Sequence, residues 1–173
     1  MTGVVDEPAG APSNGETFWR FSLAYYEKPQ VSAALIALQD RRGFDANMML
    51  FALWLGLSGR PPLDAQTLAV AEAAVCTIRV EIIEPLRRLR RALKHERAAD
   101  IQRLRGQLQA VELAAEKTEQ FRLAASVTSR GAEAPVAARL AVAAANLSLY
   151  LGPHEAASCD ADRLRRALAE FAG

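Results

Sequence analysis

Apolar side chains recur three and four positions apart from Leu68 to Leu93, and this spacing constrains the fold more than any other feature of the chain. A period of 3.6 residues places such side chains on one face of an α-helix. Pro85 lies inside the stretch, where it removes one backbone hydrogen bond and crowds the preceding turn. We therefore predict one long helix with a kink near Ile82. Its apolar face is formed by Leu68, Ala71, Val75, Ile78, Ile82, Leu86, Leu89 and Leu93.

The rest of the chain carries the same helical spacing, divided by residues that begin or end helices. Ser13 and Glu16 have the spacing of a capping box, and Asp45, Asp64 and Asp160 are suitable N-caps. No alternating run of β-branched residues predicts a strand. The expected fold is all-α, a single-domain bundle of about six to seven helices. The predicted helices start near Glu16 and cover 29–42, 46–57, the long segment after Asp64, about 101–128, 135–151 and a short stretch from 160.

Length and composition predict one soluble domain. A chain of 173 residues suits a single domain, and we predict a disordered tail over 1–15 and the bundle over 16–173. The N-terminal stretch lacks the pattern of a signal peptide. The longest apolar stretch, 48–57, is about half the length that a bilayer requires. Cys76 and Cys159 have no close partner in sequence, which favours reduced thiols, so we expect a cytoplasmic protein with no membrane contact.

Eight of the eleven aromatic residues lie between Phe18 and Trp54. Aromatic side chains bury large areas, so we expect this part of the chain, with Trp19 and Trp54, to form the most specific part of the core. The predicted helix 46–57 is apolar on nearly all sides. Such a helix is either central or covers a partner or ligand.

A polar cluster from Gln39 to Asn47 separates two apolar helices. Asp40 lies in the last turn of a helix, where a carboxylate faces the negative end of the helix dipole. It needs a compensating cation, either Arg41, Arg42 or an arginine from another helix. One interpretation is a structural clamp that holds the turn. The other is a ligand-facing pair, Asp40 and Asn47, with a nearby arginine.

A basic run follows Pro85, with eight Lys or Arg residues against two acids up to Arg105. Arg87, Arg88 and Arg91 belong to it. A solvated face that pairs with Glu112, Glu116 and Glu119 is one interpretation. The other is an anionic partner, which is nucleic acid, a phosphate-bearing ligand or an acidic protein, although no aromatic residues interleave with the arginines for base stacking.

No motif for catalysis or cofactor binding occurs. The two histidines and two cysteines lack ligand spacing, and there is no nucleophile elbow and no glycine-rich phosphate loop. We therefore expect no metal, no cofactor and no catalytic residues, and we favour a protein that is not an enzyme.

Several segments resemble one family of short helical proteins. They are Phe18–Leu23, Leu38–Asp40, Asp45–Gly56, Pro85–Lys94 and Glu112–Glu116. Together they are similar to a bacterial family of conserved hypothetical proteins, known as domain of unknown function 2390, over roughly residues 16–125. The resemblance implies a helical, bacterial, cytoplasmic protein and assigns no catalytic residues.

Three functions are compatible with these features. The first is a helical adaptor that binds a protein partner through the apolar helix 46–57 or the basic helix. The second is a small-molecule binder, or an enzyme, with a pocket between the aromatic helices and Asp40, Asn47 and an arginine. The third and weakest is nucleic-acid binding through 85–105. The sequence does not indicate an oligomeric state.

Overall fold

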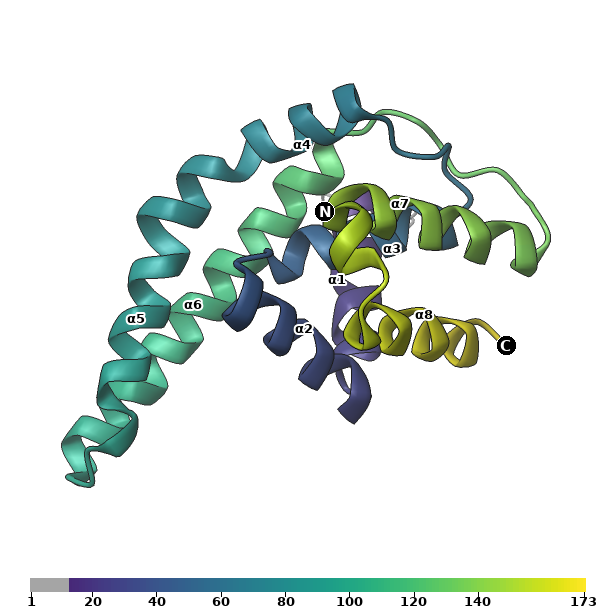
Figure 1. Ribbon diagram of the computed structural model, residues 1–173. Coiled ribbons are helices and arrows are strands. Elements are labelled where there is room, and N and C mark those ends of the chain that lie inside the picture. Colours follow the sequence, from purple (N-terminus) through teal and green to yellow (C-terminus); the bar gives the residue numbers. More distant parts are fainter. Residues whose placement is uncertain (1–12) are drawn as a thin grey trace, which may run out of the picture.

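The computed structural model describes residues 13–173, and within this range the chain is helical with no strand. Figure 1 shows the helices packed as one bundle, from which the α5–α6 hairpin extends. The predicted all-α, single-domain fold is confirmed. The helices are α1 (Asn14–Tyr26), α2 (Pro29–Arg42), α3 (Ala46–Leu57), α4 (Ala65–Ile78), α5 (Glu84–Ala92), α6 (Ala99–Ala125), α7 (Val136–Ala156) and α8 (Cys159–Ala172).

Local signals in the sequence set the ends of the first three helices. Ser13 and Glu16 form the predicted capping box at the start of α1. Pro29 occupies the first turn of α2, where its missing N–H costs nothing. Gly43 ends α2 with a φ of 74°, a conformation that other residues adopt only with strain. The Asp45 side chain accepts a hydrogen bond from the Met48 amide and begins α3.

Helix α3 lies at the centre of the bundle. Every residue from Asn47 to Gly56 is buried. Its main partner is α7, and Asn146 of α7 joins the two segments by donating to the Ala52 carbonyl at 3.1 Å and accepting from the Leu63 amide at 2.8 Å. The apolar character of α3 on all sides therefore reflects a core position.

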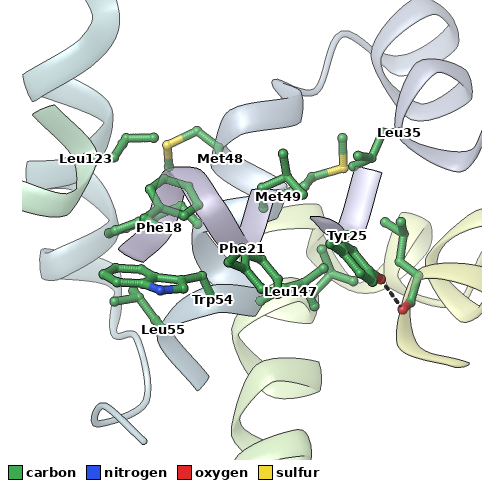
Figure 2. Close-up of a cluster of buried hydrophobic side chains, with 14 of the residues drawn as sticks. Phe18, Phe21, Tyr25, Leu35, Met48, Met49, Trp54, Leu55, Leu123 and Leu147 are labelled. Atoms are coloured by element: carbon green, nitrogen blue, oxygen red, sulfur yellow. Dashed lines mark hydrogen bonds between the residues drawn. The ribbon is translucent and has the colours of Figure 1, made fainter. Parts of the chain in front are cut away.

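The aromatic residues of α1 pack directly on α3 and α8. Figure 2 shows Phe18 beside Trp54, and their ring centroids are 5.0 Å apart. The Tyr25 hydroxyl donates a buried hydrogen bond to the Leu164 carbonyl of α8. The prediction that the N-terminal aromatic residues form the specific core is confirmed for these side chains.

The long helix continues through Pro85 by means of a π-helical segment, η1 (Arg79–Ile83). Within it the Glu84 amide donates to the Arg79 carbonyl, a wider turn that accommodates the proline next to it. In Figure 1 the helix axis bends between α4 and α5. The expected kink therefore has the form of a widened turn. After the short helix η2 (Leu93–His95), α6 returns antiparallel to α5, and this hairpin is called the arm below.

Two details differ from the prediction. Helix α6 ends at Ala125, before the predicted limit near 128. The predicted end of the next helix before Gly152 coincides with a break in α7, where Gly152 has a φ of 73° and helical turns then resume to Ala156. Ser158, not Asp160, caps α8, because the Ser158 hydroxyl accepts from the Ala161 amide. The predicted cap at Asp160 was wrong, and Asp160 instead forms ion pairs with Arg41 and Arg163.

Helix α1 begins at Asn14, so the predicted tail over 1–15 overlaps the first helical turn. The remainder of that prediction falls on residues 1–12, outside the described residues. Among the helices of the described range, α7 alone is long and apolar enough to cross a membrane. In the bundle it packs on α3 and contains the core residues Ala143, Leu147 and Leu151.

Candidate functional site

A cleft of about 640 Å³ separates the arm from the first three helices. Helices α1, α2 and α3 form one wall, and α5, η2 and α6 form the other. Both apolar and charged side chains line it. A second hollow of about 680 Å³, bounded by Ser58, Arg139 and the 131–135 loop, lies at the C-terminal end of α3, and Glu133 and Arg139 are its charged residues.

The arm wall is organised by two carboxylates of α6 and two arginines of α5. Glu112 is 5% exposed and accepts hydrogen bonds from both Arg87 and Arg90. Arg87 also donates to Glu116 at 2.8 Å, and Arg90 Nη2 lies 3.1 Å from Glu112 Oε1. The two carboxylates are four residues apart, so they face the same side of α6. The two negative charges of Glu112 and Glu116 thus neutralise the two positive charges of Arg87 and Arg90.

Burial and neighbouring charge shift the pKa values of these groups in opposite directions. Burial alone would raise the pKa of Glu112, but hydrogen bonds and charge from Arg90 and Arg87 outweigh it and lower the pKa. Burial dominates at Glu116 and raises its pKa, despite the charge of Arg87. Burial also raises the pKa of Tyr26, whose ring lines the cleft beside this cluster.

A second charged cluster lies under the cleft, centred on Arg79 of η1. Its guanidinium contacts Asp45 at 3.2 Å, Glu119 at 3.1 Å and Glu72 at 3.0 Å. Glu119 is fully buried and also accepts from Asn47 Nδ2 at 2.6 Å. Burial and the Asp45 carboxylate raise the pKa of Glu119 to about 7. Within residues 13–173, no three His, Cys, Asp or Glu side chains are placed to hold a metal ion.

Three polar atoms along the cleft have no hydrogen-bond partner within the described part of the chain. They are Ser22 Oγ, Gln120 Oε1 and Arg105 Nε. Ser22 is 3% exposed and Gln120 is 2% exposed. Gln120 uses its other amide atom, because Nε2 donates to Asn47 Oδ1 at 2.8 Å. A buried polar group without a partner costs about 1–3 kcal/mol, so such groups in a cavity point to a ligand or solvent that completes them.

Half of the side chains that the sequence suggested as binding residues line this cleft. They are Trp19, Asn47, Arg87 and Arg91. Asp40 borders the cleft through its ion pair with Arg91, at 2.6 Å. The carboxylate in the last turn of α2 is thus compensated by an arginine from another helix, as one of the alternatives for Asp40 required. Asn47 is buried and points to α6, so Asp40 and Asn47 do not act as a pair.

The other three predicted residues lie elsewhere. Arg41 pairs with Asp160 of α8 at 2.7 Å. Arg88 is exposed and does not line the cleft. Trp54 is 4% exposed in the core, with the Arg60 guanidinium 4.2 Å from its ring centroid. The polar cluster of residues 39–47 therefore contains both a structural clamp, centred on Asp45, and three residues that line the cleft, Gln39, Ala46 and Asn47.

Several cleft and network residues were not identified as site residues from the sequence. Glu112, Glu116 and Glu119 were expected only to neutralise the basic helix. One signal was present, because polar residues recur along one face of the apolar-patterned segment that forms α6. They are Arg105, Gln109, Glu112, Glu116 and Gln120. Ser22 gave no signal, since a lone serine on an aromatic helix is usual.

Comparison with known proteins gives a family without an assigned activity. No curated protein matches the chain, and no solved structure matches it. Residues 17–123 match the family described as protein of unknown function (DUF2390), and this range covers α1 to α6, including every helix that lines the cleft. The chain therefore belongs to the DUF2390 family.

Proposed function

We propose that this protein binds a small organic molecule in the cleft between the arm and α1–α3. One observation carries the proposal: Ser22 and Gln120 line the same cavity, and each has one buried polar atom, Ser22 Oγ and Gln120 Oε1, that lacks a partner in the described range. A ligand that hydrogen-bonds to both removes two unfavourable terms at once. The volume of about 640 Å³ is within the range of small-molecule sites.

The charged groups of the cleft support the same function. The ion pairs of Arg87 and Arg90 with Glu112 and Glu116 hold these side chains in place before a ligand arrives. Preorganised polar groups lose little conformational entropy on binding, which favours affinity. The proposal is binding without catalysis, in the cytoplasm; the free, exposed Cys76 and Cys159 support a reducing compartment.

The test is a thermal-shift screen of small metabolites against a variant in which the cleft is filled. Leu113 lines the cleft and is 48% exposed, so Leu113→Trp fills the mouth without disturbing the core. Val111→Trp is the matched control, because Val111 is 54% exposed on the same helix and does not line the cleft. A ligand at 100 times its Kd stabilises by about 2.7 kcal/mol, or roughly 5–10 °C for this chain length.

We expect at least one compound that raises the Tm of the wild type and of Val111→Trp, but not that of Leu113→Trp. The proposal fails if no compound raises the Tm. It also fails if the active compounds stabilise both variants equally, because they would then bind outside the cleft.

Docking of a protein partner is the second candidate, now restricted to the arm. Burial of α3 removes it as a contact surface. The arm exposes large apolar side chains, with Leu89 at 55%, Leu104 at 44% and Val111 at 54%. A photo-crosslinker at Leu104 in living cells is expected to capture one protein repeatedly, whereas the same group at Leu149 of α7, 41% exposed, is not. Equal capture at both positions would contradict this candidate.

A further inference from the structure

The cleft is elongated and follows one face of α6. The lining residues of this helix run from Arg105 to Gln120 at intervals of three and four. At 1.5 Å per residue these fifteen steps correspond to about 22 Å. The buried Ser22 and Asn47 belong to the end near Gln120, because Asn47 contacts Gln120 directly and Lys117 of α6 lies over the ring of Trp19, three residues before Ser22 on α1. The two ends of the cleft are therefore chemically distinct.

The end near the arm tip carries two cations that are not neutralised. Lys94 of η2 and Arg105 of α6 line the cleft, and neither has a carboxylate within 4.0 Å in residues 13–173. By contrast, Arg87, Arg90 and Arg91 each have one. Arg105 Nε is buried and has no acceptor in that range. A guanidinium N–H without an acceptor, in a cleft that an unpaired ammonium group also lines, is suited to an anionic oxygen.

Between the two ends, apolar side chains of α1 to α3 face an arm wall in which Leu113 is the one apolar residue among charged and polar ones. Leu23 of α1, Ile36 of α2 and Leu113 of the arm are 46%, 46% and 48% exposed, and Leu50 closes the space from α3. Trp19 lies at one side, with the Lys117 ammonium 5.7 Å from its ring. Exposed leucine and isoleucine on opposing walls favour a ligand with an apolar body.

We infer that the cleft binds an amphipathic organic anion, an apolar body with one acidic head group. The head group lies at Lys94 and Arg105. The body lies between Leu23, Ile36 and Leu113. A polar group at the far end hydrogen-bonds to Ser22 and Gln120. This inference rests on the proposed function and adds the chemical class of the ligand.

The test compares two fluorescent probes that differ in the head group. Anilinonaphthalene sulfonate carries an aromatic body and a sulfonate, whereas N-phenyl-1-naphthylamine has the same body without charge. Both are titrated into the full-length wild type, the double variant Lys94→Gln/Arg105→Gln and the control Arg88→Gln/Arg103→Gln. The control removes the same charge from two exposed arginines outside the cleft.

We expect the sulfonate to bind the wild type with one-to-one saturation. Loss of charge-assisted hydrogen bonds should weaken it by about tenfold or more in Lys94→Gln/Arg105→Gln and by less than about twofold in the control. Binding of the neutral probe should be the same in all three proteins. Because Arg105 is half-buried, Lys94→Gln alone serves as a second variant on an exposed side chain and is expected to weaken the sulfonate by about threefold.

Four outcomes would overturn the inference. The first two are equal affinity of the wild type for the neutral probe and the sulfonate, and an equal loss of sulfonate affinity in the control variant and the cleft variant. The third is an unchanged sulfonate affinity in Lys94→Gln, and the fourth is competition by inorganic sulfate at equal concentration, which would remove any role for the apolar body of the ligand. If the neutral probe binds the wild type but not Leu113→Trp, the probe occupies the cleft, and the proposed function survives the failure of this inference. If neither probe binds and the thermal-shift screen finds no ligand, both fail.

Discussion

Replacing Gly56 by alanine tests the contact between α3 and α7, and α3 forms part of the α1–α3 wall of the cleft. A Cβ at Gly56 would lie 2.2 Å from the Ala143 nitrogen and 2.4 Å from the Ala143 Cα. Ordinary contact requires about 3.5 Å, so α7 must retreat by roughly 1.3 Å. These are backbone atoms, which a side-chain rotation cannot move away.

The expected loss of stability follows from three terms. Overpacking costs about 3 kcal/mol at the upper end of its range. Retreat of α7 also stretches the two hydrogen bonds of Asn146 to the α3 region, each worth about 1 kcal/mol. Alanine returns about 1 kcal/mol through its helix propensity. We expect Gly56→Ala to lower the free energy of unfolding by about 4 kcal/mol and the Tm by roughly 8–16 °C.

Gly106→Ala is the matched control, because a Cβ at that position meets no atom within 4 Å. It lies inside α6, so the same substitution should raise stability by about 0.8–1 kcal/mol. Both changes are measured by urea unfolding followed by circular dichroism at 222 nm. Equal effects of the two substitutions, or a Gly56→Ala variant as stable as the wild type, would refute the close approach of α3 and α7.

Three further substitutions test the charged and polar contacts. Glu112→Ala leaves two half-buried arginines facing one another, so urea unfolding should show that the free energy of unfolding falls by about 2–3 kcal/mol. Glu81→Ala, at an exposed position, should change the free energy of unfolding by less than about 0.5 kcal/mol. Equal losses in the two variants would exclude the buried cluster. Glu119 has a pKa of about 7 when folded against 4.5 ordinarily, so the folded chain holds the extra proton between these values. The contribution of this proton to stability is complete below about pH 4.5 and is lost as the pH rises through 7. Glu119→Gln should therefore flatten the dependence of the unfolding free energy on pH from 5 to 8. An unchanged slope would assign the titration to another group. Tyr25→Phe removes a buried hydrogen bond and should lower the free energy of unfolding by about 1 kcal/mol, whereas Tyr26→Phe, 41% exposed, should not; similar effects would contradict the contact with α8.

The helices were predictable because their signals are local. Ser13, Gly43, Asp45 and Pro85 each act on backbone groups within four residues, so their effects are visible in the sequence. The cap of α8 shows the limit of this reasoning. Ser158 and Asp160 are both suitable caps by residue type; in the folded chain Ser158 caps the helix, and Asp160 lies in its first turn and pairs with Arg41 of α2 and Arg163.

The cleft was only half predictable because it depends on which helices meet. The side chains of Trp19, Asn47, Arg87 and Arg91 were recognised from their types, but nothing local places α1 opposite α5 and α6. Ser22 becomes notable only when burial and the absence of a partner in the described residues are known together. Burial of a serine inside a bundle is a tertiary property.

The basic run illustrates how tertiary pairing changes what a charge pattern means. Eight cations against two acids in residues 85–105 suggest a surface for a polyanion. In the folded chain, carboxylates of α6 and α2 pair with Arg87, Arg90 and Arg91. These ion pairs join α5 to α6 within the arm and join α5 to α2. The other five cations of the run, Arg88, Lys94, Arg97, Arg103 and Arg105, have no carboxylate within 4.0 Å in the described residues. Of these five, only Lys94 and Arg105 line the cleft. The pairing of three arginines thus divides the run: Lys94 and Arg105 support the proposed binding of an amphipathic anion in the cleft, and the exposed Arg88, Arg97 and Arg103 are the residues through which the weaker alternative, nucleic-acid binding, would act.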